Sequence, residues 1–188
     1  LVRKMKAEIQ RSQLVIIDMQ DKLAGAMPKE VVNKMIQRCE LIATLAKIEE
    51  IPVLVTEQYP QGLGKTLSSM IPFLTHASFI EKTAFSCVDE PKFNSKLIET
   101  RDQIILAGME SHICILQTAL DLIDQGKKVY ILEDAIVSRN ILNKQNAIFR
   151  LRDAGCILTN VESIVFEWLK NSDNPSFKTI APLIKNIC

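Results

Sequence analysis

The sequence predicts an α/β fold in three layers, with helices covering both faces of a mainly parallel, six-stranded sheet. Short runs of aliphatic and β-branched residues alternate with segments of helical periodicity along all 188 residues. The runs end in polar residues, and a hydrophobic fraction of 47% suffices for one sizeable core. We therefore expect a single domain over residues 1–188, with residues 1–11 as a flexible or non-native N-terminal stretch.

Six short segments are predicted as strands. Residues 14–17 are apolar without interruption, which is typical of a strand that is buried on both faces of a parallel sheet. The other predicted strands are residues 52–56, 78–80, 103–107, 128–132 and 156–159. In the common doubly wound order 3-2-1-4-5-6, strands one and four are neighbours, and a ligand binds beyond their carboxyl ends.

Helices are predicted between and after these strands. In residues 29–49 the apolar positions recur at helical spacing, and Pro28 stands at an acceptable helix start. Gly126 and Gly155 are predicted to end two later helices. The remaining predicted helices are residues 91–100, 113–124, 140–154, 161–171 and 176–186.

Composition excludes several classes of function. The chain has 23 Lys and Arg against 22 Asp and Glu, so its net charge of +1 gives no basic surface for nucleic acid or membrane. No apolar run approaches the ~20 residues of a membrane-spanning helix. Five scattered cysteines without a CxxC pair indicate reduced thiols, and two histidines are too few for a histidine-rich metal site. We expect a cytoplasmic protein that uses a small-molecule substrate, without a metal or cofactor.

Cys114 is the strongest candidate for a nucleophile. It lies in the predicted first turn of a helix, after strand 103–107 and Gly108. Unpaired N–H groups at such a position favour an anion and are expected to lower the pKa of the thiol. The alternative is that Cys114 is only a small core residue within an apolar segment.

Asp18 and Lys82 are candidates for charged partners of this thiol. Asp18 follows four aliphatic residues, and an unpaired carboxylate at the edge of a core costs several kcal/mol. It therefore requires a cation or hydrogen bonds, which loop N–H groups could also supply. Lys82 is either a solvated lysine or the cation that pairs with Asp18 and stabilises the thiolate of Cys114.

Three segments together carry a family resemblance. Residues 14–20 (LVIIDMQ), 81–86 (EKTAFS) and 107–114 (AGMESHIC), in this order and spacing, resemble the isochorismatase-like cysteine hydrolases. The resemblance covers nearly the whole chain. The loop 56–64 (TEQYPQGLG) and the tail 174–178 (NPSFK) look like the branch of isochorismatase-domain-containing proteins.

The resemblance implies a Rossmann-like fold and a catalytic triad. Cys114 would be the nucleophile, Asp18 the proton acceptor and later donor, and Lys82 the cation that orients them. The backbone N–H groups of Glu110 and Cys114 would form the oxyanion hole, with a cis peptide bond between Met109 and Glu110. Relatives assemble as dimers or larger, so a homo-oligomer, a dimer or tetramer, is also implied.

Two departures from the family pattern concern the substrate. Nicotinamidase members place Asp and His metal ligands after the second strand, where this chain has Glu57, Gln58 and Tyr59, so a metal-bound pyridine is not expected. Glu110 replaces a small residue of many amidases and is expected to reshape the pocket or to pair with Lys82. Candidate substrate contacts follow strand ends and are Gln20, Leu23, Gln58, Tyr59 and Phe85. A catalytically idle member that acts as a binding or interaction module is the alternative.

Overall fold

The computed structural model describes residues 5–187. Six parallel strands form one sheet in the order β3-β2-β1-β4-β5-β6, which confirms the predicted fold class and is the common doubly wound order. The strands are β1 (Ser12–Ile17), β2 (Val53–Gln58), β3 (Ser78–Lys82), β4 (Gln103–Met109), β5 (Lys128–Val137) and β6 (Ile157–Thr159).

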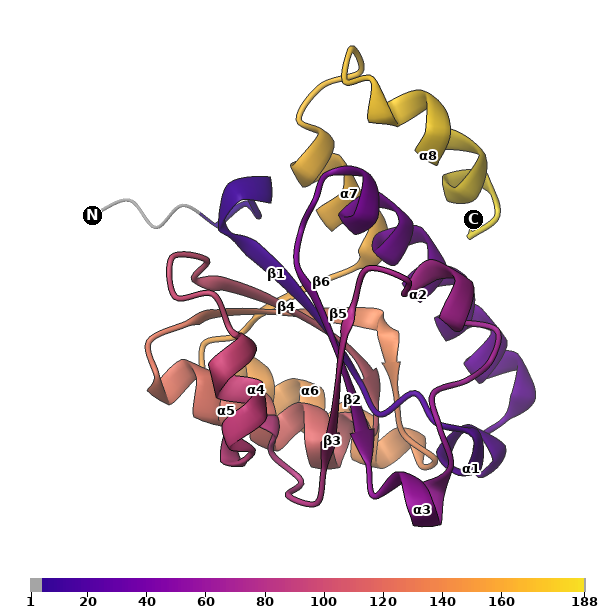
Figure 1. Ribbon diagram of the computed structural model, residues 1–188, viewed down its shortest axis with the longest axis vertical. Helices are drawn as coiled ribbons and strands as arrows, with labels where there is room; N and C mark the ends of the chain where they lie inside the picture. Colours follow the sequence, from indigo (N-terminus) through magenta and orange to yellow (C-terminus); the bar gives the residue numbers. More distant parts are fainter. Residues whose placement is uncertain (1–4, 188) are drawn as a thin grey trace.

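Helices cover both faces of the sheet (Figure 1). One face carries α2 (Lys29–Ile48), α7 (Val161–Leu169) and α8 (Ser176–Lys185). The other carries α4 (Pro91–Lys96), α5 (Leu116–Asp124) and α6 (Ile141–Asp153). Two short helices that were not predicted, α1 (Asp21–Gly25) and α3 (Pro60–Leu63), follow β1 and β2. Single turns lie at Ile9–Arg11, Ile71–Phe73 and Cys87–Asp89, and a π-helical turn, η4 (Ser111–Ile115), precedes α5.

The apolar run of β1 is explained by two cores, one on each face. Leu14 and Ile16 belong to the core under α2, α7 and α8, whereas Val15 and Ile17 belong to the core under α5. Alternate side chains of a strand point to opposite faces, so a strand covered on both faces must be apolar at every position.

The start of the described chain is packed onto the domain. The N–H of Ala7, which is buried, donates to Glu167, and the Arg11 guanidinium donates to both carboxylate oxygens of Asp102 at 2.8 and 2.6 Å. Ala7 and Arg11, within the stretch 1–11 that is predicted to be flexible or non-native, thus make contacts with the domain. Residues 1–4 of that stretch, and Cys188, lie outside the described residues.

Two predicted boundaries are wrong by four or more residues, and others differ by up to three. The helix predicted for residues 91–100 ends at Lys96. β5 continues past Glu133 and Asp134 to Val137. Within residues 5–187, every helix is too short or too polar to cross a membrane.

Gly108 lets β4 pass β1 closely before the chain turns toward Cys114. Its φ of +118° is in the region that favours glycine, and a Cβ there would lie 2.0 Å from the carbonyl oxygen of Ile17. The register between β4 and β5 also shifts between Leu106 and Gly108, which marks a β-bulge. Only glycine therefore fits this approach.

The substitution Gly108→Ala tests this requirement. We expect a loss of more than about 4 kcal/mol of unfolding free energy, because backbone strain and a clash with the backbone of β1 add. Gly126→Ala is the control, since Gly126 also has a positive φ, +77°, but open space around its Cβ position. The control is expected to cost about 1 kcal/mol. Urea denaturation measures both, and equal losses would show that the clash is absent.

Candidate active site

The carboxyl ends of four neighbouring strands bring three predicted residues together. Asp18 directly follows β1, Lys82 is the last residue of β3, and Cys114 lies in η4 after β4. In the observed strand order β1 stands between β2 and β4, where the direction of winding reverses. The site therefore occupies the switch point of the sheet.

Asp18 is fully buried and is fixed by two partners. Its Oδ1 accepts a hydrogen bond from Thr56 Oγ1 at 2.7 Å, and its Oδ2 lies 2.9 Å from Lys82 Nζ. The backbone at Asp18 is left-handed, with a φ of +50°, a conformation that Asp tolerates better than most residues. This turn directs the carboxylate toward the ends of β2 and β3 instead of along β1.

Lys82 is held by several oxygen atoms. Besides Asp18, its Nζ donates to Gln58 Oε1 at 2.6 Å and to the carbonyl oxygens of Ala84 and Phe85 at 3.1 and 3.2 Å. Burial lowers the pKa of Lys82, but the charge of Asp18 and the nearby thiols Cys87 and Cys114 outweigh it, so the pKa is raised. Lys82 is thus a buried lysine whose ammonium group is paired with oxygen atoms, and not a solvated lysine.

Cys114 is almost buried, with 6% of its surface exposed. Burial raises the pKa of its thiol, and the charge of Asp18 and a hydrogen bond with Asp18 raise it further, whereas Lys82 lowers it. The net effect is a raised pKa, so the predicted lowering is wrong for the resting protein. The physical reason is that desolvation and the carboxylate outweigh the cation and the helix start. The Cys114 thiol therefore lies beside the carboxylate of Asp18, with the cation of Lys82 close to both.

Two residues of this cluster escaped sequence reasoning. Thr56, the hydroxyl donor to Asp18, is the polar residue that follows the apolar run of β2. Cys87 is buried, and its Sγ lies 3.9 Å from Thr56 Oγ1. Its N–H bonds to Thr118, one helical turn after Cys114. The signal that the sequence offered for Thr56 was a hydroxyl residue at the end of an apolar strand.

The five candidate substrate contacts divide by exposure. Gln20, Gln58 and Leu23 are buried or partly buried, whereas Tyr59 and Phe85 are exposed. Gln20 is fully buried and bonds to the backbone N–H and carbonyl of Gln58, so it braces β2. Gln58 accepts from Lys82 and donates to the backbone at Thr83. Leu23 packs partly buried against the core. Tyr59 and Phe85 are more than half exposed and adjoin Lys82 through backbone hydrogen bonds.

Glu110 pairs with Arg139 and not with Lys82, which corrects one of the two expectations for it. The peptide bond between Met109 and Glu110 is cis. The Glu110 side chain is buried, its Oε2 accepts from the backbone N–H of Arg139 at 2.9 Å, and its Oε1 lies 3.6 Å from Arg139 Nε. Glu110 therefore ties the turn before Cys114 to the loop between β5 and α6.

Glu57, predicted to follow the second strand, lies within β2 and is used for internal contacts. Glu57 accepts from the backbone and hydroxyl of Thr66 and from Lys65. Burial opposes ionisation of Glu57, but these bonds outweigh it and lower its pKa. Among residues 5–187, His, Cys, Asp and Glu do not form a group of three that could hold a metal ion.

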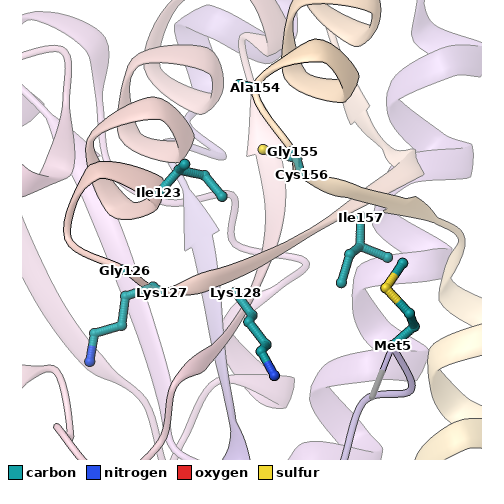
Figure 2. A pocket seen from close by; sticks show the side chains of 9 residues that line it. All are labelled: Met5, Ile123, Gly126, Lys127, Lys128, Ala154, Gly155, Cys156 and Ile157. Carbon is teal, nitrogen blue, oxygen red and sulfur yellow. The ribbon is translucent and has the colours of Figure 1, made fainter. Parts of the chain in front are cut away.

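A separate cavity of about 430 Å³ lies at the opposite end of the sheet (Figure 2). Lys128, at the start of β5, and Ile157, at the start of β6, line it together with Met5 and the buried Cys156. These are the amino ends of the strands, so this cavity is distinct from the cluster around Cys114.

Comparison with known proteins identifies the family. A model of the isochorismatase domain matches residues 12–163. The chain belongs to the isochorismatase family. This match spans β1 to α7 and includes Asp18, Lys82 and Cys114.

Similarity to known proteins extends over nearly the whole of this isochorismatase-family chain. Isochorismatase domain-containing protein 2 from Bos taurus is 36% identical over 179 residues, which cover 93% of this chain and 83% of that protein. Isochorismatase family protein 1B from Dictyostelium discoideum is 32% identical, with coverages of 93% and 86%. The structure of MAR1 ribonuclease from Caenorhabditis elegans has a TM-score of 0.89 and 32% identity, and covers 96% of this chain and 92% of that one.

A double-mutant cycle on Asp18 and Lys82 tests their coupling. Lys82→Met is expected to cost about 3–5 kcal/mol of unfolding free energy, because it leaves a buried carboxylate without its cation. Adding Asp18→Asn to Lys82→Met should recover part of this loss. Lys34→Met, which removes the exposed pair with Glu30, should leave stability nearly unchanged. Additive effects of the two site substitutions in denaturant titrations would contradict a buried ion pair.

Proposed function

We propose that this member of the isochorismatase family is a cysteine hydrolase that acts on a small molecule through a covalent intermediate. Cys114 is the nucleophile, Asp18 the proton acceptor and donor, and Lys82 the cation that fixes Asp18. The observation that carries the proposal is the buried contact between Lys82 and Asp18, 2.9 Å, with the Cys114 thiol beside the same carboxylate. Amides, ureides, carbamates and related C–N or C–O bonds are the proposed substrates.

The first step uses the proton that Cys114 already shares. When a carbonyl carbon lies against Sγ, Asp18 takes the thiol proton and a bond forms between Sγ and that carbon. The carbonyl electron pair moves to oxygen, and the N–H groups of Glu110 and Cys114 are proposed to stabilise the oxyanion. Because the proton moves only over a hydrogen bond, a raised thiol pKa at rest does not prevent attack.

The second half of the reaction returns the proton. As the tetrahedral intermediate collapses, the C–N or C–O bond breaks and Asp18 gives its proton to the leaving group. A water then attacks the thioester, Asp18 accepts a proton from it, and that proton returns to Sγ as the C–S bond breaks. Lys82 stays protonated throughout and keeps Asp18 in place. These steps run through the chain's own residues, and we propose that neither a metal nor an organic cofactor takes part.

A small molecule fits the site better than RNA, although the related C. elegans structure carries the name of a ribonuclease. The net charge of +1 offers little attraction for phosphate backbones. The three proposed catalytic residues are also almost completely buried, which favours a small substrate over a polymer. We further propose a homo-oligomer and a cytoplasmic location, the latter because the four described cysteines are free thiols.

The competing proposal is that the protein is catalytically inactive and acts as a binding or interaction module. A substrate screen distinguishes this proposal from a cysteine hydrolase. Wild type and Cys114→Ala are tested with small amides, ureides, carbamates and isochorismate. We expect a C–N or C–O substrate to be turned over by wild type and at least about 10³-fold more slowly by the variant, because the covalent route is lost. Cys156→Ala is the control for loss of a buried thiol away from the site. Turnover that survives Cys114→Ala would exclude the mechanism.

Alkylation kinetics test the role of each charge on the thiol. Asp18→Asn removes a charge that raises the Cys114 pKa, so iodoacetamide should label Cys114 faster than in wild type at pH 7, while turnover falls. Lys82→Met removes the charge that lowers this pKa, so labelling should slow. Peptide mass spectrometry distinguishes Cys114 from Cys87. If Asp18→Asn slowed labelling instead, Asp18 would act on the thiol mainly as its base, and an unchanged rate would contradict contact between the carboxylate and the thiol.

A further inference from the structure

Cys87 is a second buried thiol of the site, and the proposed reaction does not use it. It begins the short turn after β3 and belongs to the same hydrophobic core as Cys114. Its backbone N–H donates to Thr118 Oγ1 at 2.9 Å, which holds the turn against α5. Its Sγ lies 3.9 Å from Thr56 Oγ1, within reach of a sulfur donor. A buried cysteine is often only a small core residue, but this thiol meets the hydroxyl group that contacts Asp18.

The chemistry of the three groups fixes the direction of both hydrogen bonds. Asp18 is paired with Lys82, and an ionised carboxylate can only accept hydrogen bonds. Thr56 must therefore give its single hydroxyl hydrogen to Asp18 Oδ1, 2.7 Å away, and it offers Cys87 only the lone pairs of its oxygen. Burial raises the pKa of Cys87 to about 11, so this thiol carries a proton at neutral pH and can donate it. The hydrogen bonds thus run from thiol to hydroxyl to carboxylate.

This hydrogen-bonded chain controls the surroundings of the carboxylate. Asp18, Thr56 and Cys87 are all fully buried, and hydrogen bonds that share an atom strengthen each other where the dielectric constant is low. Each oxygen of Asp18 faces a donor, Thr56 at Oδ1 and Lys82 at Oδ2. An ammonium group has no lone pair, and a hydroxyl that is held as a donor does not turn to accept. A proton on Asp18 can then leave only toward Cys114 and its substrate.

We infer that Cys87 and Thr56 are positioning residues, in which the Cys87 thiol holds the Thr56 hydroxyl as a donor to Asp18. The ionised carboxylate is thereby kept ready to take the proton of Cys114, and the proton that it takes is kept for the leaving group. This inference rests on the proposed function, because it gives both residues a role in the proton transfers of that reaction. Both act through Asp18 and not on the substrate.

Infrared spectroscopy tests the hydrogen-bonded chain without a substrate. The difference between wild type and Cys87→Ala isolates the S–H stretch of Cys87, which should be lowered in frequency by the hydrogen bond to Thr56. Thr56→Val keeps the shape of the side chain but lacks the hydroxyl, so the band should move to higher frequency, whereas Thr56→Ser should leave it in place. The S–H band of Cys39, a buried thiol of the other core, is the control and should be the same in all backgrounds. A Cys87 band that does not move in folded Thr56→Val would overturn the inference.

The pH profile of kcat/KM tests the role in proton transfer. Thr56→Val should lower kcat/KM about 10–100-fold and move the acidic limb about 1–2 pH units upward, because the ionised carboxylate loses a hydrogen bond and is protonated at higher pH. Thr56→Ser should restore both, and Cys87→Ala should move the limb in the same direction by less. A slower Thr56→Val enzyme with an unmoved limb would show a merely structural role and overturn the inference. Absence of turnover by wild type would instead refute the proposed function, and the Cys87 band would still decide whether the chain of hydrogen bonds exists.

Discussion

The buried contact between Asp18 and Lys82 is the interaction on which the rest of the site depends. Removing either charge from water would cost several kcal/mol, so each charged side chain needs the other in order to be buried at the carboxyl ends of the strands. Thr56 and Gln58 complete the arrangement from β2, the strand between those that carry the two charges. The order of the parallel strands thereby brings the carboxylate of Asp18 next to the ammonium group of Lys82.

The same contact explains why a thiol with a raised pKa can still be a nucleophile in our proposal. Cys114 is buried beside a carboxylate, and both conditions favour the neutral thiol at rest. Lys82 keeps the carboxylate charged and in place, so the base that removes the proton is always within a hydrogen bond. Activation then coincides with substrate binding. A permanently ionised thiolate would be exposed to oxidation and alkylation, whereas this arrangement protects it.

Sequence reasoning reached the parts of the structure that depend on local pattern. The continuous apolar runs of β1 and β4 and the polar residues at their ends predicted the parallel sheet and the position of Asp18 at the end of a strand, whereas the order of the strands was assumed from the common doubly wound fold. The edge strand β3 was difficult to predict because it is short and contains both buried and exposed residues. Partners of Glu110 and the raised pKa of Cys114 could not be predicted, because both depend on residues distant in the chain and on the degree of burial. Helices α1 and α3 are only one turn long and leave little periodicity to detect.

Measuring the protonation state of Cys114 tests most directly whether a neutral thiol is hydrogen-bonded to Asp18. Infrared difference spectroscopy of wild type against Cys114→Ser at neutral pH isolates the S–H stretch of this one thiol, because the other cysteines cancel. We predict an S–H band shifted to lower frequency by the hydrogen bond to Asp18, and predict that Asp18→Asn removes the shift or the band. Absence of an S–H band in wild type would mean that Cys114 is a resting thiolate, and would contradict the account.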